Sequence, residues 1–223
     1  MKRKVFFLPL LLLMALLLSC NKNDDENYSL GKIWINMGLV DTINTMGYNF
    51  VIYADNGDTL LPVANAVKHF ETFNNQRVIV NYTKLGDMGD SSKVFYVKIN
   101  NLNNVLYKHI VEENKIDDDS LGNDPVNITE MWTNKNMLNI EFSYWGEYKT
   151  HFINLELTDN DSDNAGLVFR HNSTNDNMSY YYNAIVTFNL EKIKIEGQNE
   201  RNFIVKWTDY ENVEHQMNGT YKY

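Results

Sequence analysis

Short stretches of alternating apolar and polar residues, separated by polar turns, recur along most of the chain after residue 30. A two-residue period is typical of β-strands that bury one face. In the first half of the chain it predicts strands over residues 31–40, 46–54, 59–63, 77–85, 93–102 and 104–110. No long stretch has helical periodicity, so the pattern predicts an all-β fold.

The spacing of these strands predicts a small barrel in the first half of the chain. The sequence Asp55-Asn-Gly-Asp58 favours a hairpin turn. The strand that follows this turn contains Pro62, which favours a position at a sheet edge. Five to six strands in about eighty residues fit a Greek-key barrel of the oligonucleotide/oligosaccharide-binding (OB) kind, with a sandwich as the open alternative. We expect an OB-like five-stranded barrel over residues 28–112.

An acidic segment then interrupts the strand pattern. Residues 112–125 contain six acids, followed by the breakers Gly122 and Pro125. A cation site is one interpretation of the acids, but a solvated linker is the commoner one, and we place it at residues 113–125. Strands resume over residues 137–145, 150–157, 166–171, 183–190, 201–208 and 214–221. Their regular spacing predicts an antiparallel β-sandwich over residues 126–223.

The first 19 residues have the pattern of an export signal. Lys2, Arg3 and Lys4 precede an apolar run over residues 5–18, which is shorter than a membrane span. Leu17-Leu-Ser-Cys20 matches the bacterial lipobox, in which the cysteine is lipidated and becomes the new N-terminus. Cys20 is the only cysteine, so neither a disulfide within the chain nor a Cys-Cys metal site is expected. We therefore expect a membrane anchor through lipid on Cys20.

Residues 20–27 form a polar, acidic tether without apolar periodicity. Lys22 followed by Asp24-Asp-Glu26 resembles the acidic signal that sends Bacteroidetes lipoproteins to the outside of the outer membrane. The chain is thus expected at the outer membrane, with the cell surface favoured over the periplasmic face.

Charge narrows the choice of partner. The formal net charge is −9, and it becomes −12 once the three cations of residues 1–19 are removed. Such a chain repels phosphate backbones, so nucleic acid is not an expected partner. The sequence contains no nucleophile elbow, P-loop or dinucleotide fingerprint, and no cofactor is expected.

Two histidines are the main candidates for chemistry. His151 and His171 fall in predicted neighbouring strands and would meet across a hairpin. With an acid such as Glu141 they would form a metal or acid/base site, and a metal-dependent hydrolase would follow. A structural pair within a sheet is the commoner outcome, so no catalytic residue is expected.

Weaker candidates for binding lie elsewhere. Asp159, Asp161 and Asp163 alternate as in a calcium loop, but Asn164 replaces its glycine and Arg170 its last glutamate, so a hairpin loop is favoured. Aromatic residues that would stack on a sugar or a peptide, if they are exposed rather than buried, are Trp34, Tyr48, Tyr53 and Trp145.

Three short segments resemble the O-glycosylation acceptor of Bacteroidetes, an aspartate followed by Ser or Thr and an apolar residue. The candidate acceptors are Thr42, Thr59 and Ser120. Composition alone would give about one such match, so the pattern is suggestive.

Several segments together resemble the NigD-like lipoproteins of Bacteroidetes. They are Tyr28-Ser-Leu-Gly31, Arg77-Val-Ile-Val-Asn-Tyr82, Leu121-Gly-Asn-Asp-Pro125, His151-Phe-Ile-Asn-Leu155 and Phe169-Arg-His-Asn172. The resemblance implies an N-terminal OB-like domain followed by a C-terminal β-sandwich, and a suspected role in bacteriocin immunity, with no catalytic residues to carry over. We expect a lipid-anchored, non-catalytic envelope protein that binds a protein or glycan partner, with a bacteriocin or toxin immunity lipoprotein as the alternative.

Overall fold

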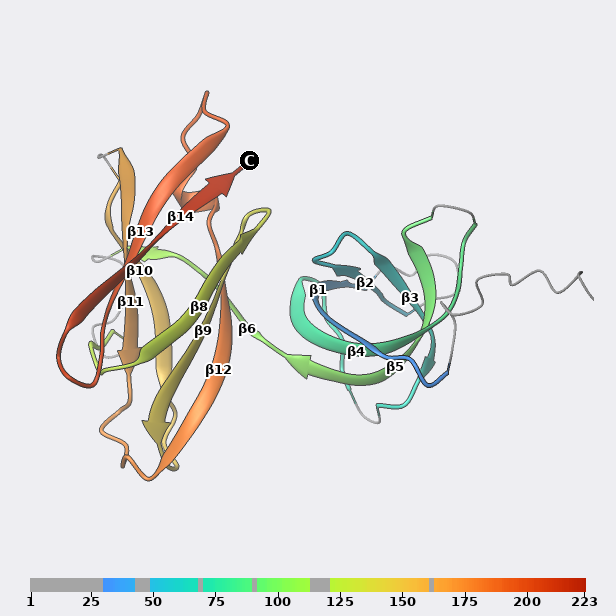
Figure 1. Cartoon of the computed structure of the whole chain (residues 1–223), viewed down its shortest axis with the longest axis horizontal. Coiled ribbons are helices and arrows are strands. Elements are labelled where there is room, and N and C mark those ends of the chain that lie inside the picture. The colour runs from blue at the N-terminus through green and yellow to red at the C-terminus, as the bar shows by residue number, and fades with distance from the viewer. Residues whose placement is uncertain (1–29, 43–48, 68–69, 90–91, 113–120, 161–162) are drawn as a thin grey trace, which may run out of the picture.

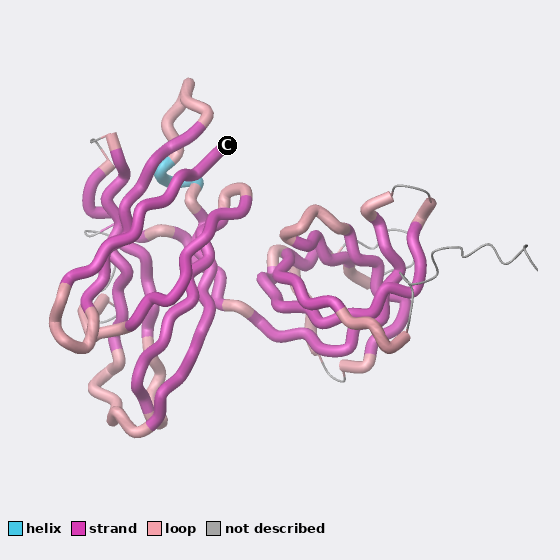
Figure 2. Tube along the Cα trace, viewed as in Figure 1, coloured by secondary structure: helices cyan, strands magenta, loops and turns pink. Residues whose placement is uncertain are grey.

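The computed structural model describes residues 30–42, 49–67, 70–89, 92–112, 121–160 and 163–223. In these ranges the chain forms two β-domains that lie side by side and are joined by one connection (Figure 1). Strands dominate, and the short 3₁₀ helix η3 (Glu191–Ile193) is the helix visible in the trace (Figure 2). Among the described residues, no helix is long and apolar enough to cross a membrane.

The N-terminal domain is a closed barrel of five strands, which confirms the predicted OB-like fold. The order around the barrel is β1-β2-β3-β5-β4; β3 and β5 run parallel, and the other neighbours run antiparallel. The strands are β1 (Trp34–Asp41), β2 (Val51–Ala54), β3 (Thr59–Asn65), β4 (Gln76–Asp87) and β5 (Val94–Asn104).

The two-residue period explains the core of the barrel. Val78, Val80 and Tyr82 of β4 point inward and are fully buried, as are Val97 and Ile99 of β5. The expected hairpin follows β2, where the amide of Ala54 donates to the carbonyl of Asp58 at 2.8 Å. Gly57 in this turn has φ of 87°, a conformation that residues with a side chain rarely adopt.

The C-terminal domain is a β-sandwich, as predicted, with sheet orders β6-β12-β9-β8 and β14-β13-β11-β10-β7. Its strands are β6 (Leu106–His109), β7 (Val111–Glu112), β8 (Asn127–Asn134), β9 (Met137–Gly146), β10 (Phe152–Asp159), β11 (Asn164–Asn172), β12 (Tyr180–Asn189), β13 (Glu200–Thr208) and β14 (Glu214–Lys222). Most neighbours are antiparallel, but β6–β12, β7–β10 and β11–β13 are parallel.

The domain boundary lies earlier than the expected linker at residues 113–125. The amide of Val105 still bonds to Arg77 of the barrel, whereas β6 and β7 pair with β12 and β10 of the sandwich. The predicted strand over residues 104–110 therefore belongs to the sandwich, and the barrel ends near residue 105 instead of 112. Residues 113–120, in the expected linker, lie outside the described part of the chain.

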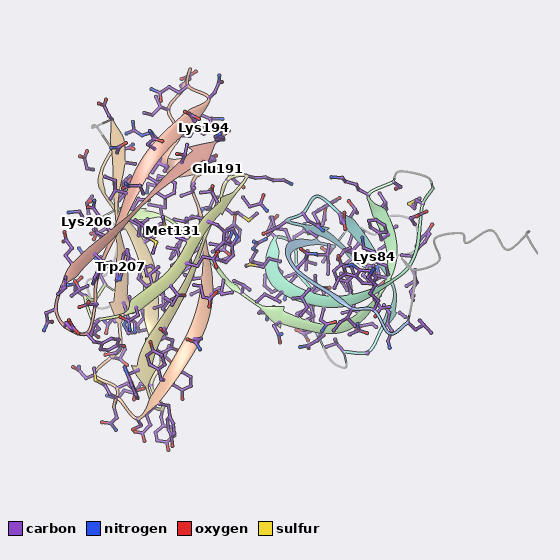
Figure 3. The ribbon with its side chains drawn as sticks, viewed as in Figure 1. Lys84, Met131, Glu191, Lys194, Lys206 and Trp207 are labelled. Atoms are coloured by element: carbon purple, nitrogen blue, oxygen red, sulfur yellow. The ribbon has the colours of Figure 1, made fainter. Side chains whose placement is uncertain are left out.

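The core of the sandwich is contributed by both sheets. Leu138, Ile140 and Phe142 of β9 face Leu155 and Phe169 of the opposite sheet, and all are buried. Figure 3 shows the side chains along both sheets, including Met131 and Trp207, which also pack on this core.

The strand β10 departs from simple alternation. Ile153 and Leu155 face the core, yet Asn154 and Glu156 on the other face are also buried. Lys108 donates to the carbonyl of Ile153 at 2.8 Å and to the amide oxygen of Asn154. Arg170 donates to Glu156 at 2.6 Å. Long cationic side chains therefore cover polar positions that the pattern alone would leave in solvent.

Candidate functional site

One arginine connects the barrel to the sandwich. Arg77 of β4 is 1% exposed, and its guanidinium donates to both carboxylate oxygens of Asp55 at 2.6 and 2.5 Å. It also donates to Asn139 of β9 at 3.0 Å and to Thr187 of β12 at 3.3 Å. Asp55 lies in the barrel, whereas Asn139 and Thr187 lie in the sandwich, so a single side chain binds both domains.

Two further hydrogen bonds complete this contact, which we call the Arg77 lock. Thr187 donates to Asn139 at 2.7 Å, and Asn134 donates to the backbone carbonyl of Asp55 at 3.3 Å. A planar, bidentate arginine–carboxylate pair has strong geometric preferences. That pair orients the guanidinium, and its bonds to Asn139 and Thr187 hold the barrel against the outer face of the sheet β6-β12-β9-β8, the side of the sandwich that faces the barrel in Figure 1.

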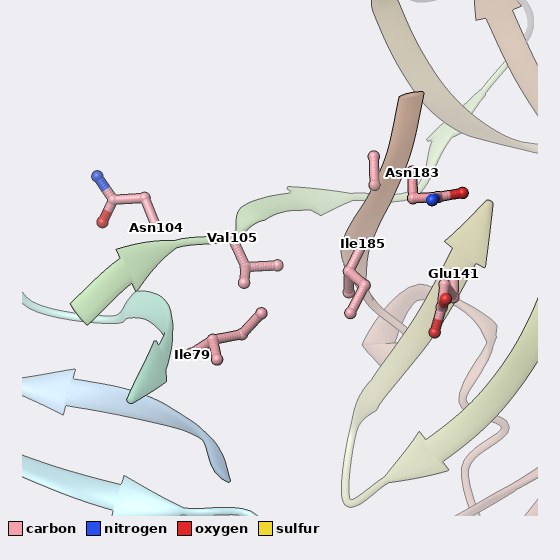
Figure 4. A pocket seen from close by; sticks show the side chains of 7 residues that line it. Ile79, Asn104, Val105, Glu141, Asn183 and Ile185 are labelled. Carbon is pink, nitrogen blue, oxygen red and sulfur yellow. The ribbon is translucent and has the colours of Figure 1, made fainter. Parts of the chain in front are cut away.

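Next to the lock, residues of both domains line an open crevice of about 280 Å³. Ile79, Asn104 and Val105 line it from the barrel side, and Figure 4 shows them opposite residues of β9 and β12. The sandwich contributes Glu141, Asn183, Ala184 and Ile185. Concave sites with apolar walls and a few polar groups are typical of binding sites, and they often lie between domains.

The acid in the crevice has an acidic neighbour. Glu141 of β9 is paired directly opposite Glu130 of β8, and no ion pair is found for either residue within the described ranges. Like charges directly opposite each other in a sheet are destabilising. The position is therefore electrostatically suited to a cation.

Beyond the crevice, the same outer face becomes aromatic. Tyr181 and Trp145 are 47% and 38% exposed, and their rings lie 5.1 Å apart. The hydroxyl of Tyr181 lies 2.6 Å from that of Ser143 and accepts a hydrogen bond from Asn127 at 3.3 Å. These bonds, from Ser143 first and then Asn127, lower the pKa of Tyr181 and hold its ring in place. Crevice and aromatic pair thus form one continuous surface.

The structure brings together the predicted histidine pair. Nδ1 of His151 lies 2.8 Å from Nε2 of His171, and Nε2 of His151 lies 3.2 Å from a carboxylate oxygen of Asp176. Asp176 also accepts hydrogen bonds from the amides of Glu147 and Tyr148. The pair lies near the end of the sandwich, packed against Tyr144.

Protonation in this cluster follows from burial of His171 and from hydrogen bonds to Asp176. Burial lowers the pKa of His171, and the neighbouring His151 lowers it further, against opposing effects of Asp124 and two backbone groups. Burial alone would raise the pKa of Asp176, yet the amides of Glu147 and Tyr148 and the ring of His151 hold it well below its usual range. The cluster thus contains a neutral His171 and an ionised Asp176.

The acid of this cluster is not the one considered from the sequence. Glu141 lies in the other sheet and lines the crevice, whereas Asp176 comes from the turn after β11. Asp176 is one of several polar residues in that turn, and no sequence signal separates it from them. Within the described ranges, no three His, Cys, Asp or Glu side chains form a group suited to a metal ion. The adjoining cavity measures about 50 Å³, the space of a few water molecules.

The aspartates of the calcium-like loop follow β10. Arg201 donates to the backbone carbonyls of Asp163 and Asn160, both at 3.1 Å, so a guanidinium holds this loop. Asp159 ends β10, and Asp161 lies outside the described residues.

The other residues singled out from the sequence are scattered. Thr42 is exposed and donates to Asn74 at 3.0 Å, and Thr59 begins β3. Trp34 stacks on Tyr82 with 6.1 Å between ring centroids, and Tyr53 is 42% exposed. Cys20, Tyr48 and Ser120 lie outside the described residues. Lipidation and glycosylation remain predictions. Of the three candidate aromatics that the structure describes, Trp145 joins the surface beside the crevice.

A closed five-stranded OB barrel joined to a two-sheet β-sandwich defines the class of protein. Family models for these two parts match in the same order: the NigD-like N-terminal OB domain over residues 40–105 and the NigD-like C-terminal beta sandwich domain over residues 108–221. The chain belongs to the NigD-like family, as the sequence resemblance implied. The matched ranges also agree with a boundary near Val105.

Solved structures support this assignment. A Parabacteroides distasonis protein named "Putative TOXIN related protein" is 31% identical, with a TM-score of 0.72 over 86% of this chain and 94% of that one. A NigD-like immunity protein from Bacteroides caccae is 16% identical, with a TM-score of 0.68 over 87% and 99%. A Bacteroides fragilis protein named "Putative lipoprotein (BF3042)" is 12% identical, with a TM-score of 0.60 over 86% and 98%. The last two show the fold alone, and no curated protein matches the chain.

Proposed function

We propose that this protein is a lipid-anchored, non-catalytic component of the bacterial envelope that binds a protein or glycan partner in the crevice between its domains. The observation that carries the proposal is the crevice itself, whose walls come from both domains beside the Arg77 lock. A buried lock that orients two domains pre-organises a site between them, which reduces the cost of ordering on binding.

The chemistry of the histidine cluster favours binding over catalysis. Both ring nitrogens of His151 are engaged, one with His171 and the other with Asp176, and the remaining nitrogen of His171, Nδ1, is buried away from solvent. A general base needs a free nitrogen within reach of a substrate proton, and the adjoining cavity of about 50 Å³ is far smaller than an ordinary substrate site. The pair is better suited to a structural role at the end of the sandwich.

Attachment to the membrane is supported by the leader sequence. Residues 1–19 and the lipobox at Cys20 predict a lipoprotein, and a structural relative bears the name of one. The acidic tether favours the outer face of the outer membrane. A short tether on a lipid would hold the crevice close to the membrane, within reach of other envelope proteins or of external ligands.

Photo-crosslinking in native cells tests the proposed binding surface. A photo-reactive amino acid in place of Tyr181 lies on the aromatic part of the surface, and one in place of Met88, which is 49% exposed on the barrel, provides the matched control. We expect a discrete covalent adduct from position 181 and none of the same mass from position 88. Equal adducts at both positions, or none at position 181, would contradict a partner at this surface.

Toxin immunity is the second candidate, favoured by the names of two relatives. If this chain confers immunity, the surface beside the crevice binds a toxin before it reaches its target. Deleting the gene should then sensitise the producing strain to toxin in its own culture supernatant, and a plasmid copy should restore growth. Unchanged growth of the deletion strain would remove this candidate and leave the general binding role intact.

A further inference from the structure

One edge of the sandwich is only partly covered. Strand β12 pairs with β9 along its whole length, Tyr180 to Asn189, but β6 covers its other edge only from Val186 to Asn189. The chain leaves this edge at Val105, whose amide turns to bond to Arg77 of the barrel. Within the described ranges, the segment Tyr180–Ile185 therefore has no strand on its outer side.

The register shows which backbone groups face outward. The amide of Leu190 donates to the carbonyl of Asn136, and the pairing of β12 with β9 continues without a shift from this point. In an antiparallel ladder, bonds to one neighbour alternate along the strand, so the even-numbered residues of β12 bond to β9. Tyr181 and Asn183 consequently turn their N–H and C=O groups toward the uncovered edge.

Such an edge is unusual in a native sheet. Proteins normally protect edges with Lys, Pro, bulges or a covering segment, because unpaired N–H and C=O groups are a template for another strand. Residues 180–185 read Tyr-Tyr-Tyr-Asn-Ala-Ile and include neither Lys nor Pro. Their pairing with β9 contains no bulge, and all four residues from Tyr180 to Asn183 are exposed.

The crevice lies at one end of this edge. Asn183, Ala184 and Ile185 line it, so a strand added beside β12 would run directly into it. Ile79, Val105 and Ile185 supply apolar walls that suit the aliphatic stem of a long side chain. Glu141, opposite Glu130 and with no ion pair among the described residues, supplies negative charge for a cationic head group.

We propose that an extended segment of a partner protein adds to β12 as a new strand beside Tyr180–Ile185 and places a Lys or Arg side chain in the crevice. This inference rests on the proposed binding function and specifies its partner chemistry. A strand matches the spacing of the outward amides and carbonyls, which a glycan does not, and β6 already uses the same edge in this way.

Charge favours a basic partner segment over a second copy of this chain. Two copies paired through β12 would bring two Glu130–Glu141 pairs toward each other, and the mature chain carries a formal charge of −12. Like charges brought together across an interface oppose association. A Lys or Arg of a partner would instead offset the repulsion already present between the two glutamates.

A library of phage-displayed random 12-residue peptides, selected on the protein purified in detergent from its native membrane, tests the proposal. We expect enriched peptides to alternate β-branched or aromatic residues with polar ones and to carry Lys or Arg. For a synthetic peptide of that sequence, removing both acids with Glu130→Gln and Glu141→Gln should weaken Kd by about tenfold, the usual size of a hydrogen bond to a charged group.

The backbone contact has its own matched pair of variants. Asn183→Pro removes an outward N–H that makes no ladder bond, a position where edge strands tolerate proline, and should weaken Kd by about tenfold or more. Asn183→Ala removes the side chain but keeps this N–H, so it should weaken Kd by less than Asn183→Pro does. Circular dichroism and thermal unfolding show whether each variant is folded.

N-methylated peptides keep the test decisive even if Asn183→Pro fails to fold. Methyl groups on the amides of one edge of the peptide should abolish binding, and methyl groups on the opposite edge should be tolerated. No enrichment of peptides, or equal effects of methylation on both edges, would overturn strand addition. Discrete adducts from position 181 in native cells would then still support a partner at this surface, so the two proposals fail separately.

Discussion

The guanidinium of Arg77 on β4 and the carboxylate of Asp55, in the turn that follows β2, form a bidentate pair with N–O distances of 2.6 and 2.5 Å. The arginine side chain is fully buried, and Asp55 is 18% exposed. Because the same guanidinium donates to Asn139 and Thr187, the pair contributes both to the stability of the barrel and to its contact with the sandwich.

Asp55→Ala should lower the free energy of unfolding by about 3–5 kcal/mol, because it leaves a buried guanidinium without its counter-charge. Urea denaturation followed by tryptophan fluorescence measures the change. The control is Glu214→Ala, which breaks the exposed pair with Lys206 and should cost less than about 1 kcal/mol. Similar losses in the two variants would show that Arg77 is not held by Asp55.

Gly219→Ala should lower the free energy of unfolding by about 1–3 kcal/mol through overpacking. A Cβ at this position would lie 2.2 Å from the ring of Phe203, which is buried in the sandwich core. Gly86→Ala is the matched control, because its Cβ would meet Tyr96 at an ordinary 3.8 Å. Thermal melts of the two variants should therefore separate clearly, with the control close to the unsubstituted protein.

The stability of the sandwich should fall as the pH drops below about 6.5, the ordinary pKa of histidine. Since burial lowers the pKa of His171 in the folded state, the unfolded chain binds a proton first, and protonation then favours unfolding. The contribution of neutral His171 to stability is complete above the pKa that it has in the unfolded chain. It is lost as the pH falls toward the lower pKa of the folded state. The ring of His171 is faced by His151, whose charge adds to the lowering of its pKa, by Asp124, whose charge opposes it, and by the ring of Tyr144.

His171→Gln should flatten the dependence of the unfolding free energy on pH between about 7.5 and 5, measured by urea denaturation at each pH. His109→Gln replaces an exposed histidine and should leave the slope unchanged. Asp176 acts in a separate window: its lowered pKa contributes stability above the ordinary aspartate pKa of about 3.9 that is lost at more acid pH. An unaltered slope in His171→Gln would mean that His171 is not buried in the neutral form.

Cys20→Ala should release the protein from the membrane fraction of native cells, because the leader predicts lipid on this cysteine alone. Detergent phase partitioning of the variant and of the unsubstituted protein gives the comparison, with Met88→Ala as a control that leaves the lipobox intact. Protease treatment of intact and lysed cells then distinguishes the cell surface from the periplasm. Retention of Cys20→Ala in the membrane would contradict the predicted anchor.

Alternation along the chain was enough to predict most strands and both domain types. It worked for β4 and β9, whose inward residues are consistently apolar, such as Val78 and Val80 in one and Ile140 and Phe142 in the other. Alternation could not assign the strand over residues 104–110 to a domain, because the pattern of a short strand does not reveal which strand it pairs with. The parallel pairing of Leu106 with Val186 put that strand in the sandwich.

The site was less predictable than the fold. The meeting of His151 and His171 followed from predicted strand neighbours, but their acid, Asp176, is held by backbone amides that only the folded turn brings together. The sequence suggests Glu141 as the acid beside the two histidines, but in the structure Glu141 lines the crevice. Arg77 appeared only as part of a family-like segment, since burial of a charge depends on partners more than 60 residues away, such as Asn139 at a separation of 62.

The Arg77 lock should hold the two domains in one arrangement in solution, and the distance between them measures this directly. Spin labels on cysteines placed at Leu85 and Glu211, in a chain starting at residue 21 and therefore free of other cysteines, report the distance from barrel to sandwich. Pulsed electron paramagnetic resonance should give one narrow distance distribution, and Asp55→Ala should broaden it. A broad distribution in the unsubstituted protein would contradict a pre-formed crevice between the domains.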